Sequence, residues 1–320
     1  MMVIMFFGMG VSSIICGLSN SKVDLFIGLS LLGLSCSIYH PVGISWVVNS
    51  TLKKGRALGI NGIFGGVGIG SGAFIAGLLL KYFDWQFTFI LPGIFSILIS
   101  FLLLYLILQN KVSFKNINNY PSKETHSKNN LILISMIMLF AMFGLGLTFQ
   151  IMQTSLPKVF DLRLSNFSTF HIGSTIGIIY FIAGLMTFVG GLLADTFALK
   201  KIYLIGLLGQ VPCYFSIAYI TGFPLIIVCL LAAMFNSSIL PSENILLSKF
   251  TPEEHHGLVY GCKFIISFGS GPIAVFLVAK IYELTFEFEN LFIISSLIIL
   301  TVSFLALFLP YKSLNLNKSI

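Results

Sequence analysis

Two ionisable residues of opposite charge lie inside apolar stretches of the sequence, where charges are rare and usually functional. Glu243 lies near the end of stretch 223–248, and Lys263 lies near the start of the next stretch, 257–281. If both stretches are helices, the two side chains reach a similar depth, where either charge alone would be expensive to bury. Three interpretations are open: a structural ion pair, a gate or substrate-coupled pair, and two residues that do not meet.

The second candidate is a histidine that directly precedes a proline, in the sequence Tyr39-His40-Pro41. Pro41 removes one backbone hydrogen bond and is expected to bend its helix. His40 lies about midway between Lys22 and Lys53, which places it near the middle of an apolar span. Imidazole at that depth can carry a proton or bind an anion. The alternative is a neutral histidine that is hydrogen-bonded to a neighbouring helix.

Other polar side chains inside apolar stretches either line a cavity or join helices through hydrogen bonds. They are Asn61, Gln150, Gln153, Tyr180, Asn236, Asn244 and Tyr260. His255 and His256, beside Glu253 and Glu254, are interpreted as a solvated helix start. The sequence contains no phosphate-binding loop, metal-ligand spacing or nucleophile–base pair, so it predicts no enzyme, no cofactor and no metal site.

Ten long apolar stretches position these residues. Only 9% of the chain is charged and 57% is hydrophobic, which leaves too few charges to cover a water-soluble domain. A helix needs roughly 20 apolar residues to span the hydrocarbon, whereas barrel strands are short and alternate. The sequence therefore predicts an all-α polytopic membrane protein. Its expected spans are 2–18, 25–49, 57–80, 86–108, 131–156, 172–194, 202–220, 223–248, 257–281 and 290–309.

The distribution of basic residues predicts the orientation. If the chain begins in the cytoplasm, the inner segments hold twelve Lys and Arg residues and the outer segments hold five. Because basic loops stay inside, both termini are expected to be cytoplasmic, in a plasma or inner membrane. This bias explains the net charge of +7, so the expected partner is the lipid bilayer and not a nucleic acid. The inner set is Lys53, Lys54, Arg56, Lys111, Lys115, Lys123, Lys128, Lys200, Lys201, Lys249, Lys312 and Lys318; the outer set is Lys22, Lys81, Lys158, Arg163 and Lys280.

An internal repeat indicates two related halves. The Gly-Ser-Gly sequence at 70–72 returns 199 residues later at 269–271. The polar segment 109–130, rich in Asn, Lys and Ser, is expected to be a solvated cytoplasmic linker. The predicted domains are therefore an N-terminal bundle of four helices, 1–108, and a C-terminal bundle of six helices, 131–320.

The stretch after the first basic loop is dense in glycine. One face carries Gly55, Gly59, Gly62, Gly66 and Gly70 at steps of three or four residues. Such a face lets two helices approach closely. A dinucleotide-binding loop is excluded, because no strand precedes the glycines. We therefore expect close packing against another helix.

Segment 191–201, with the sequence GLLADTFALKK, resembles a motif of the major facilitator superfamily of transporters. That family carries G-x-L-a-D-r-x-G-r-k-r between the second and third helices of each half. The matching positions are Gly191, Leu193, Asp195, Lys200 and Lys201, and the departures are Thr196, Ala198 and Leu199. The resemblance implies that the acid at a helix end bridges to a neighbouring helix in one conformation, while the basic pair stays cytoplasmic.

The same resemblance implies a fold and a function. The expected fold is a pair of helical bundles with pseudo-twofold symmetry around a central cavity. The expected function is secondary active transport of a small organic solute by alternating access, by a monomer, with H⁺ or Na⁺ as candidate coupling ions. Residues on helices that would line the cavity, and the pair, are the pathway candidates: Tyr39, His40, Asn61, Gln150, Gln153, Asn236, Glu243 and Lys263.

The sequence departs from the family pattern in two places. The first copy of the motif would end where this chain begins, so the four leading helices look like the third to sixth of a standard twelve. Either the start codon is placed too late or the gene is a remnant, and the alternative function is a truncated, non-transporting membrane remnant or scaffold. In the family's antiporter signature Ser71 replaces a proline and Phe74 a glycine, so antiport is not predicted.

Overall fold

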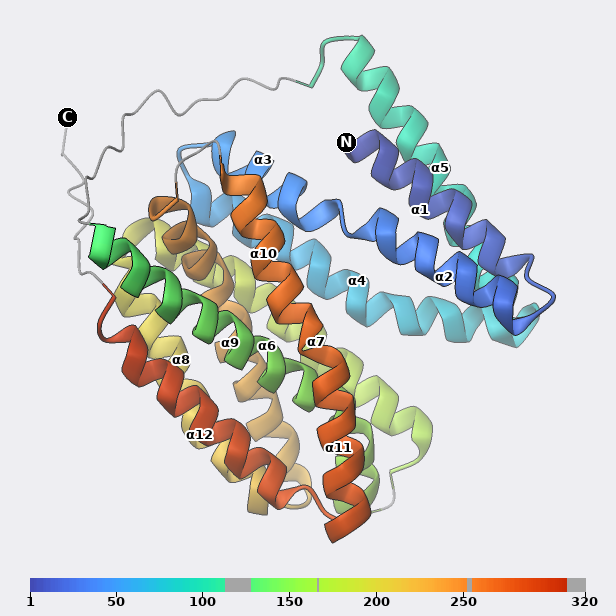
Figure 1. The fold of residues 1–320 in the computed structure, drawn as a ribbon. Coiled ribbons are helices and arrows are strands. Elements are labelled where there is room, and N and C mark those ends of the chain that lie inside the picture. The colour runs from blue at the N-terminus through green and yellow to red at the C-terminus, as the bar shows by residue number, and fades with distance from the viewer. Residues whose placement is uncertain (113–127, 166, 252–254, 310–320) are drawn as a thin grey trace. The chain divides into compact units, whose positions relative to one another are not determined.

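The computed structural model describes residues 1–112, 128–165, 167–251 and 255–309, and all the regular structure in these ranges is helical (Figure 1). Eight helical segments among them are long and apolar enough to cross a membrane. The predicted all-α polytopic architecture is therefore confirmed. Most of the predicted linker, 113–127, lies outside the described residues.

The helices follow one another in two sets. Before the linker lie α1 (Met2–Gly17), α2 (Lys22–Cys36), η1 (Tyr39–Ile44), α3 (Ser45–Asn49), α4 (Lys54–Tyr82) and α5 (Phe87–Leu108). After it lie α6 (Lys128–Arg163), α7 (Thr169–Thr196), α8 (Leu199–Tyr219), α9 (Phe223–Lys249), α10 (His256–Gly269), α11 (Gly271–Thr285) and α12 (Glu289–Ala306). Counting Lys22–Asn49 and His256–Thr285 as one segment each, the described residues form four helical segments before the linker and six after it.

Two expected spans are interrupted. The π-helical turn η1 contains Pro41, whose ring cannot fit the regular α-helical turn and whose nitrogen cannot donate to it. The other break lies at Ser270, where α10 ends, and Pro272 stands in the first turn of α11. Proline is accepted there because the first-turn N–H groups have no partner inside the helix. The sequence predicted the disturbance at Pro41 but missed the break at Ser270.

Contacts divide the chain into two compact units. Unit 1 comprises Met1–Leu52, Ser71–Tyr120 and His256–Gly261. In this unit α1 packs against α2 and α5 (Figure 1). Three serine hydroxyls donate to backbone carbonyls across the contact between α1 and α5, which joins these apolar helices by polar links. They are Ser13 to Phe89 at 2.7 Å, Ser96 to Phe6 at 2.8 Å and Ser100 to Val3 at 2.9 Å.

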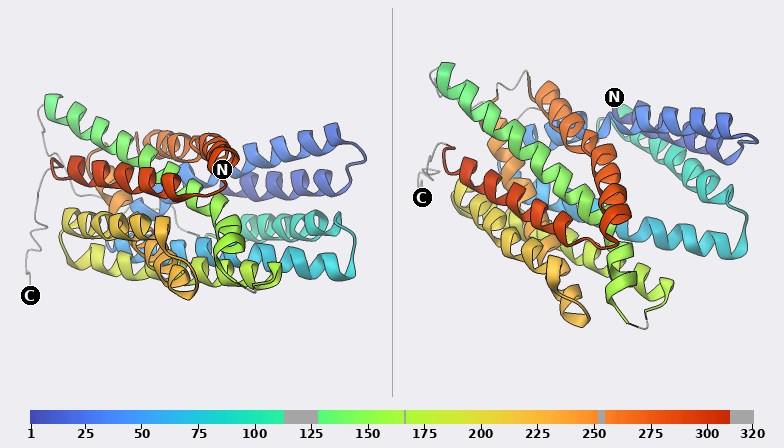
Figure 2. Two further views of the ribbon diagram at one scale, coloured as in Figure 1. Left: turned by 90° about the horizontal axis from the view of Figure 1, so that it is seen from below. Right: turned by 60° about the horizontal axis from the view of Figure 1, so that its bottom comes forward.

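Unit 2 comprises Lys53–Gly70, Pro121–His255 and Cys262–Ile320. Here α9 packs against α7 and α8, and α12 packs against α6 and α8 (Figure 2). The core of unit 2 contains fully buried aromatic side chains, including Tyr214 and Phe292. By its contacts the first half of α4 belongs to unit 2, although the sequence assigns it to the N-terminal bundle. The predicted domain boundary at the linker stays a prediction.

Candidate functional site

Glu243 and Lys263 meet in the interior of unit 2. Lys263 Nζ on α10 lies 3.1 Å from Glu243 Oε2 on α9, and the two side chains are only 5% and 4% exposed. Lys263 also donates to Asn244 Oδ1 at 2.7 Å, and its ammonium lies 5.6 Å from the centre of the Phe264 ring. The interpretation in which the two charges do not meet is therefore wrong. A structural pair and a gate are both compatible with this geometry.

Asp195, in the last turn of α7, caps the N-terminus of α4. Its Oδ1 accepts a hydrogen bond from the Gly55 N–H and its Oδ2 accepts one from the Arg56 N–H, each at 2.7 Å. These N–H groups belong to the first turn of α4, where they have no partner inside the helix and form the positive end of its dipole. The carboxylate therefore satisfies two donors with strong, charge-assisted hydrogen bonds.

Lys200 acts at a helix end of the opposite polarity. Its ammonium donates to the carbonyls of Leu307 and Leu309, at 2.7 and 2.6 Å, just beyond the end of α12. The last carbonyls of a helix lack partners and attract cations. Lys201, the next residue, is exposed. Segment 191–201 thus holds one helix N-terminus through an acid and one helix C-terminus through a lysine.

The glycine face of α4 packs closely on α7. A Cβ atom added to Gly66 would lie 2.5 Å from the Cα of Gly184, and one added to Gly59 would lie 2.9 Å from the Cα of Phe188. A Cβ at Gly191, in the motif, would meet the backbone of Gly55. The prediction of close packing for this face is confirmed at the described positions. By contrast, a Cβ at Gly65, Gly68 or Gly72 would meet nothing within 4 Å.

The remaining pathway candidates fall into both units. Tyr39 and His40 lie in η1 in unit 1, half-buried, with ring centroids 5.1 Å apart and edge-to-face. Half-buried Asn61, Gln150 and Gln153 belong to unit 2. An apolar hollow of about 460 Å³ in unit 1 is lined by Pro41, Trp46 and Ile107 among others, but by none of the candidates.

Asn236 serves as a link between helices. Its Nδ2 donates to Gln210 Oε1 on α8 at 3.2 Å, and Gln210 Nε2 donates to the Gly206 carbonyl at 3.1 Å. Gln210 is fully buried and Asn236 is 8% exposed. This arrangement matches the alternative that the sequence left open for such amides, a polar link between packed helices.

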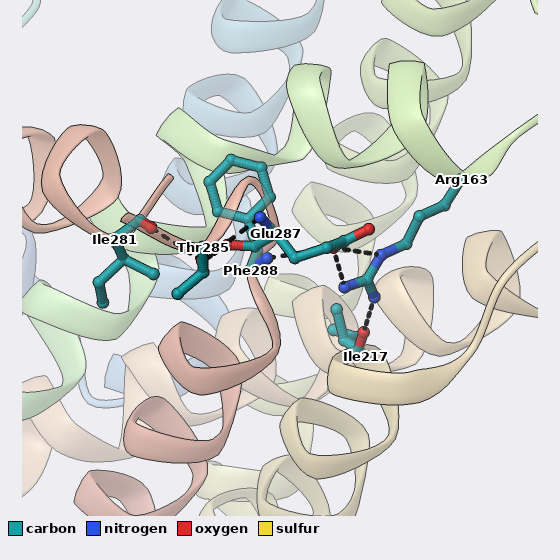
Figure 3. Close-up of polar contacts among 6 residues, drawn as sticks. All are labelled: Arg163, Ile217, Ile281, Thr285, Glu287 and Phe288. Carbon is teal, nitrogen blue, oxygen red and sulfur yellow. Dashed lines mark hydrogen bonds and ion pairs between the residues drawn. The ribbon is translucent and has the colours of Figure 1, made fainter. Parts of the chain in front are cut away.

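Arg163 is a buried charged residue, although the sequence predicts it only as one of the basic residues of the outer loops. Its side chain is 3% exposed, and it points from the end of α6 toward Glu287 and Ile217 (Figure 3). Nε and Nη2 donate to Glu287 Oε2 at 3.2 and 2.6 Å, and Nη1 donates to the Ile217 carbonyl at 2.6 Å. The guanidinium thereby joins α6, α8 and the turn between α11 and α12.

The interpretation of the histidine pair as a solvated helix start is wrong for one member. His255 is exposed, but His256 is only 2% exposed. Its Nδ1 lies 3.3 Å from Asn49 Oδ1 at the end of α3, and its ring makes an edge-to-face contact with Tyr260. The reason is position: His256 is the first residue of α10, and that turn packs inside unit 1.

The charged groups described above form ion pairs and hydrogen bonds to helix ends. Among the described residues, no group of three or more His, Cys, Asp or Glu side chains could hold a metal ion. Glu243 and Lys263 form a buried ion pair within their helices. Asp195, Lys200 and Arg163 instead make contacts at helix ends. Contacts at helix ends can break and re-form without disrupting the helices themselves.

A family model described as Major Facilitator Superfamily matches residues 1–261 and 165–319. Over 99 residues the chain is 32% identical to the riboflavin transporter RibZ of Clostridioides difficile (strain 630). This match covers 30% of this chain and 22% of that protein. Over 147 residues it is 29% identical to an uncharacterized transporter of Buchnera aphidicola subsp. Schizaphis graminum, covering 43% of this chain and 35% of that protein. The matches thus span between about a fifth and a third of these relatives.

Solved structures share the fold. The transporter FucP in its outward conformation superimposes with a TM-score of 0.74 at 15% identity, covering 97% of this chain and 83% of FucP. The human organic anion transporter MFSD10 (TETRAN) superimposes with a TM-score of 0.72 at 16% identity, covering 95% of this chain and 76% of that one. At such identities the likeness concerns the fold alone.

Proposed function

The chain belongs to the major facilitator superfamily, and from this premise we propose that it is a secondary active transporter that moves a small organic solute by alternating access. Membership of this family makes it a multi-pass membrane transporter and not an enzyme. The observation that best supports the mechanism is the cap that Asp195 forms on α4.

The cap supports alternating access because it is strong yet made only at a helix end. Two charge-assisted hydrogen bonds hold α4 to the end of α7 in this conformation. The glycines beside them let the two helix backbones lie against each other, with little side-chain interlocking to oppose sliding. Release of Asp195 from Gly55 and Arg56 would therefore free α4 to move as a rigid rod.

The solute pathway is proposed to include the polar groups inside the spans. Glu243 and Lys263 form its charged part, and His40, Asn61 and Gln150 are further polar candidates. An ionisable carboxylate within a membrane span is suited to coupling with H⁺ or Na⁺. We propose that both termini are cytoplasmic, in a plasma or inner membrane, because the basic loop residues are concentrated on one side. The proposed functional unit is a monomer.

Transport by reconstituted protein tests the proposal. Proteoliposomes are loaded with solute on one side, and uptake and efflux are measured under an imposed H⁺ or Na⁺ gradient across a panel of organic solutes that includes riboflavin. We expect saturable movement of at least one solute that is accelerated by one gradient and slowed in Asp195→Asn. Protein that assembles normally but moves no member of the panel under either gradient would contradict the function.

A further inference from the structure

A tyrosine beside the buried ion pair has a hydroxyl that the conformation described here leaves unsatisfied. Tyr203, in the first turns of α8, is fully buried, and its hydroxyl has no hydrogen-bond partner among the described residues. A buried donor without a partner destabilises a fold, and phenylalanine would fill the same space without that cost. Such an orphaned group is explained if it acquires a partner in another conformation.

The packing register between α8 and α9 identifies the partner. A Cβ at Gly206 would meet Ile239, a Cβ at Gly209 would lie 2.6 Å from the Phe235 ring, and Gln210 bonds to Asn236. The numbers on α8 rise as those on α9 fall, so the helices run antiparallel.

Extending this register by one turn places Tyr203 opposite Ser242 and Glu243. Ser242 already donates its hydroxyl to the Ile239 carbonyl. The register therefore makes the Glu243 carboxylate the candidate acceptor for this orphaned donor after a small shift between α8 and α9.

We propose that Tyr203 is the second partner of Glu243, and that it holds this carboxylate when an anionic group of the transported solute takes Lys263. A carboxylate offers about four acceptor positions, so Glu243 can accept from a phenol as well as from an ammonium. Tyr203 is in this sense a positioning residue. The proposal rests on the proposed transport function, and it adds a class of substrate, organic anions such as carboxylates.

The need for an anion follows from the cost of separating the pair. Breaking a buried ion pair leaves two uncompensated charges, and each requires a replacement partner. Tyr203 supplies a hydrogen bond for Glu243. Lys263 keeps its bond to Asn244, but this amide oxygen is neutral and does not replace the lost negative charge. A solute carboxylate does, whereas its uncharged amide does not.

A double-mutant cycle on purified protein tests the role of Tyr203 without requiring a known solute. In the wild-type background we expect Tyr203→Phe to leave the melting temperature unchanged or to raise it. In a Lys263→Met background Glu243 depends on Tyr203, so adding Tyr203→Phe should shift the unfolding equilibrium by about tenfold or more toward the unfolded state. Lys263→Gln replaces the methionine variant if that variant does not assemble.

Tyr214→Phe is the matched control. Tyr214 is also buried on α8, but its hydroxyl already donates to the Thr148 carbonyl at 3.3 Å. Tyr214→Phe should lower the melting temperature by the same amount whether residue 263 is lysine or methionine. If Tyr203→Phe behaves in this way too, Tyr203 is a purely structural residue and the proposal is overturned.

The solute class is tested by thermal stabilisation with benzoate, nicotinate and succinate, each compared with its amide. We expect at least one carboxylate to stabilise the wild type, its amide to have no effect, and Tyr203→Phe to weaken the apparent affinity by about tenfold. The anion assignment is overturned if a carboxylate and its amide stabilise the protein equally, or if none of the three carboxylates stabilises it. These measurements do not require turnover, so failure of the transport assay alone would contradict the proposed function and leave the role of Tyr203 decided.

Discussion

Asp195 accepts a hydrogen bond from the backbone N–H of Gly55 at 2.7 Å, although the two residues are 140 positions apart in the chain. The side chain belongs to the family motif at the end of α7, and its partner belongs to the first turn of α4. The bond links the most recognisable acid in the sequence to the start of its glycine-rich helix. It therefore gives the motif a mechanical role that can be measured.

Replacing Asp195 should loosen this cap. Asp195→Ala removes both bonds to the first turn of α4, and we expect a loss of about 1–3 kcal/mol in the free energy of unfolding. Asp195→Asn keeps one acceptor oxygen but turns an amide donor toward the second N–H, so it should lie between alanine and wild type. Thermal unfolding in detergent measures the stability of both variants. An alanine variant as stable as the wild type would show that the cap does not stabilise the protein.

Two classes of glycine on α4 should respond differently to alanine. Gly66→Ala places a methyl group 2.5 Å from the Cα of Gly184, so the two helices must separate and the protein should lose stability and transport. Gly65→Ala and Gly68→Ala add a methyl group where nothing lies within 4 Å. These two should be neutral or stabilising by up to about 1 kcal/mol, because alanine favours a helix over glycine.

Melting temperature and initial transport rate of the three alanine variants check the distinction between these glycines. Equal losses at Gly65, Gly66 and Gly68 would mean that any added side chain disturbs α4, whatever it faces.

The sequence predicted much of the fold because its strongest signals are long apolar stretches and rare charges. Glu243 and Lys263 were recognised because charge stands out in an apolar stretch, and their contact is present in the structure. Asp195 was recognised from its motif. The break at Ser270 was missed because Gly, Ser and Pro near it are all tolerated within membrane helices, so their types do not fix where a helix stops.

Other residues were missed because their importance depends on what surrounds a helix end. Arg163 stands at the end of a span, where counting loop charges treats any basic residue as solvated, and only the fold brings Glu287 to it. Tyr203 stands near a span end, where tyrosines are common membrane anchors. Its orphaned hydroxyl is visible only once α9 is packed against α8.

The clamp around Arg163 should be sensitive to shape as well as to charge. Arg163→Lys keeps the charge, but an ammonium cannot reproduce the planar fork that reaches both Glu287 and the Ile217 carbonyl. We expect Arg163→Lys and Arg163→Ala to lower the free energy of unfolding, with a loss of about 2–4 kcal/mol for alanine.

Lys158→Ala is the control for the Arg163 variants. Lys158 forms an ion pair with Asp161 near the same end of α6, but both side chains are about half exposed, so its loss should cost less than about 1 kcal/mol. Chemical denaturation of the three variants measures the difference. Similar costs at Arg163 and Lys158 would show that the buried guanidinium adds nothing beyond an ordinary surface pair.

The adjacent histidines at the start of α10 provide the sharpest comparison, because they differ in burial and not in type. His256→Ala removes a 2% exposed ring from its contacts with Asn49 and Tyr260, and we expect a loss of about 1–3 kcal/mol. His255→Ala changes an exposed side chain and should stay within about 0.5 kcal/mol of wild type. Asn49→Ala should reproduce part of the loss caused by His256→Ala, and combining the two should cost less than their sum, since both remove the same hydrogen bond. Melting temperatures of the four proteins decide the matter: equal effects at positions 255 and 256, or full additivity of His256→Ala and Asn49→Ala, would contradict the contact.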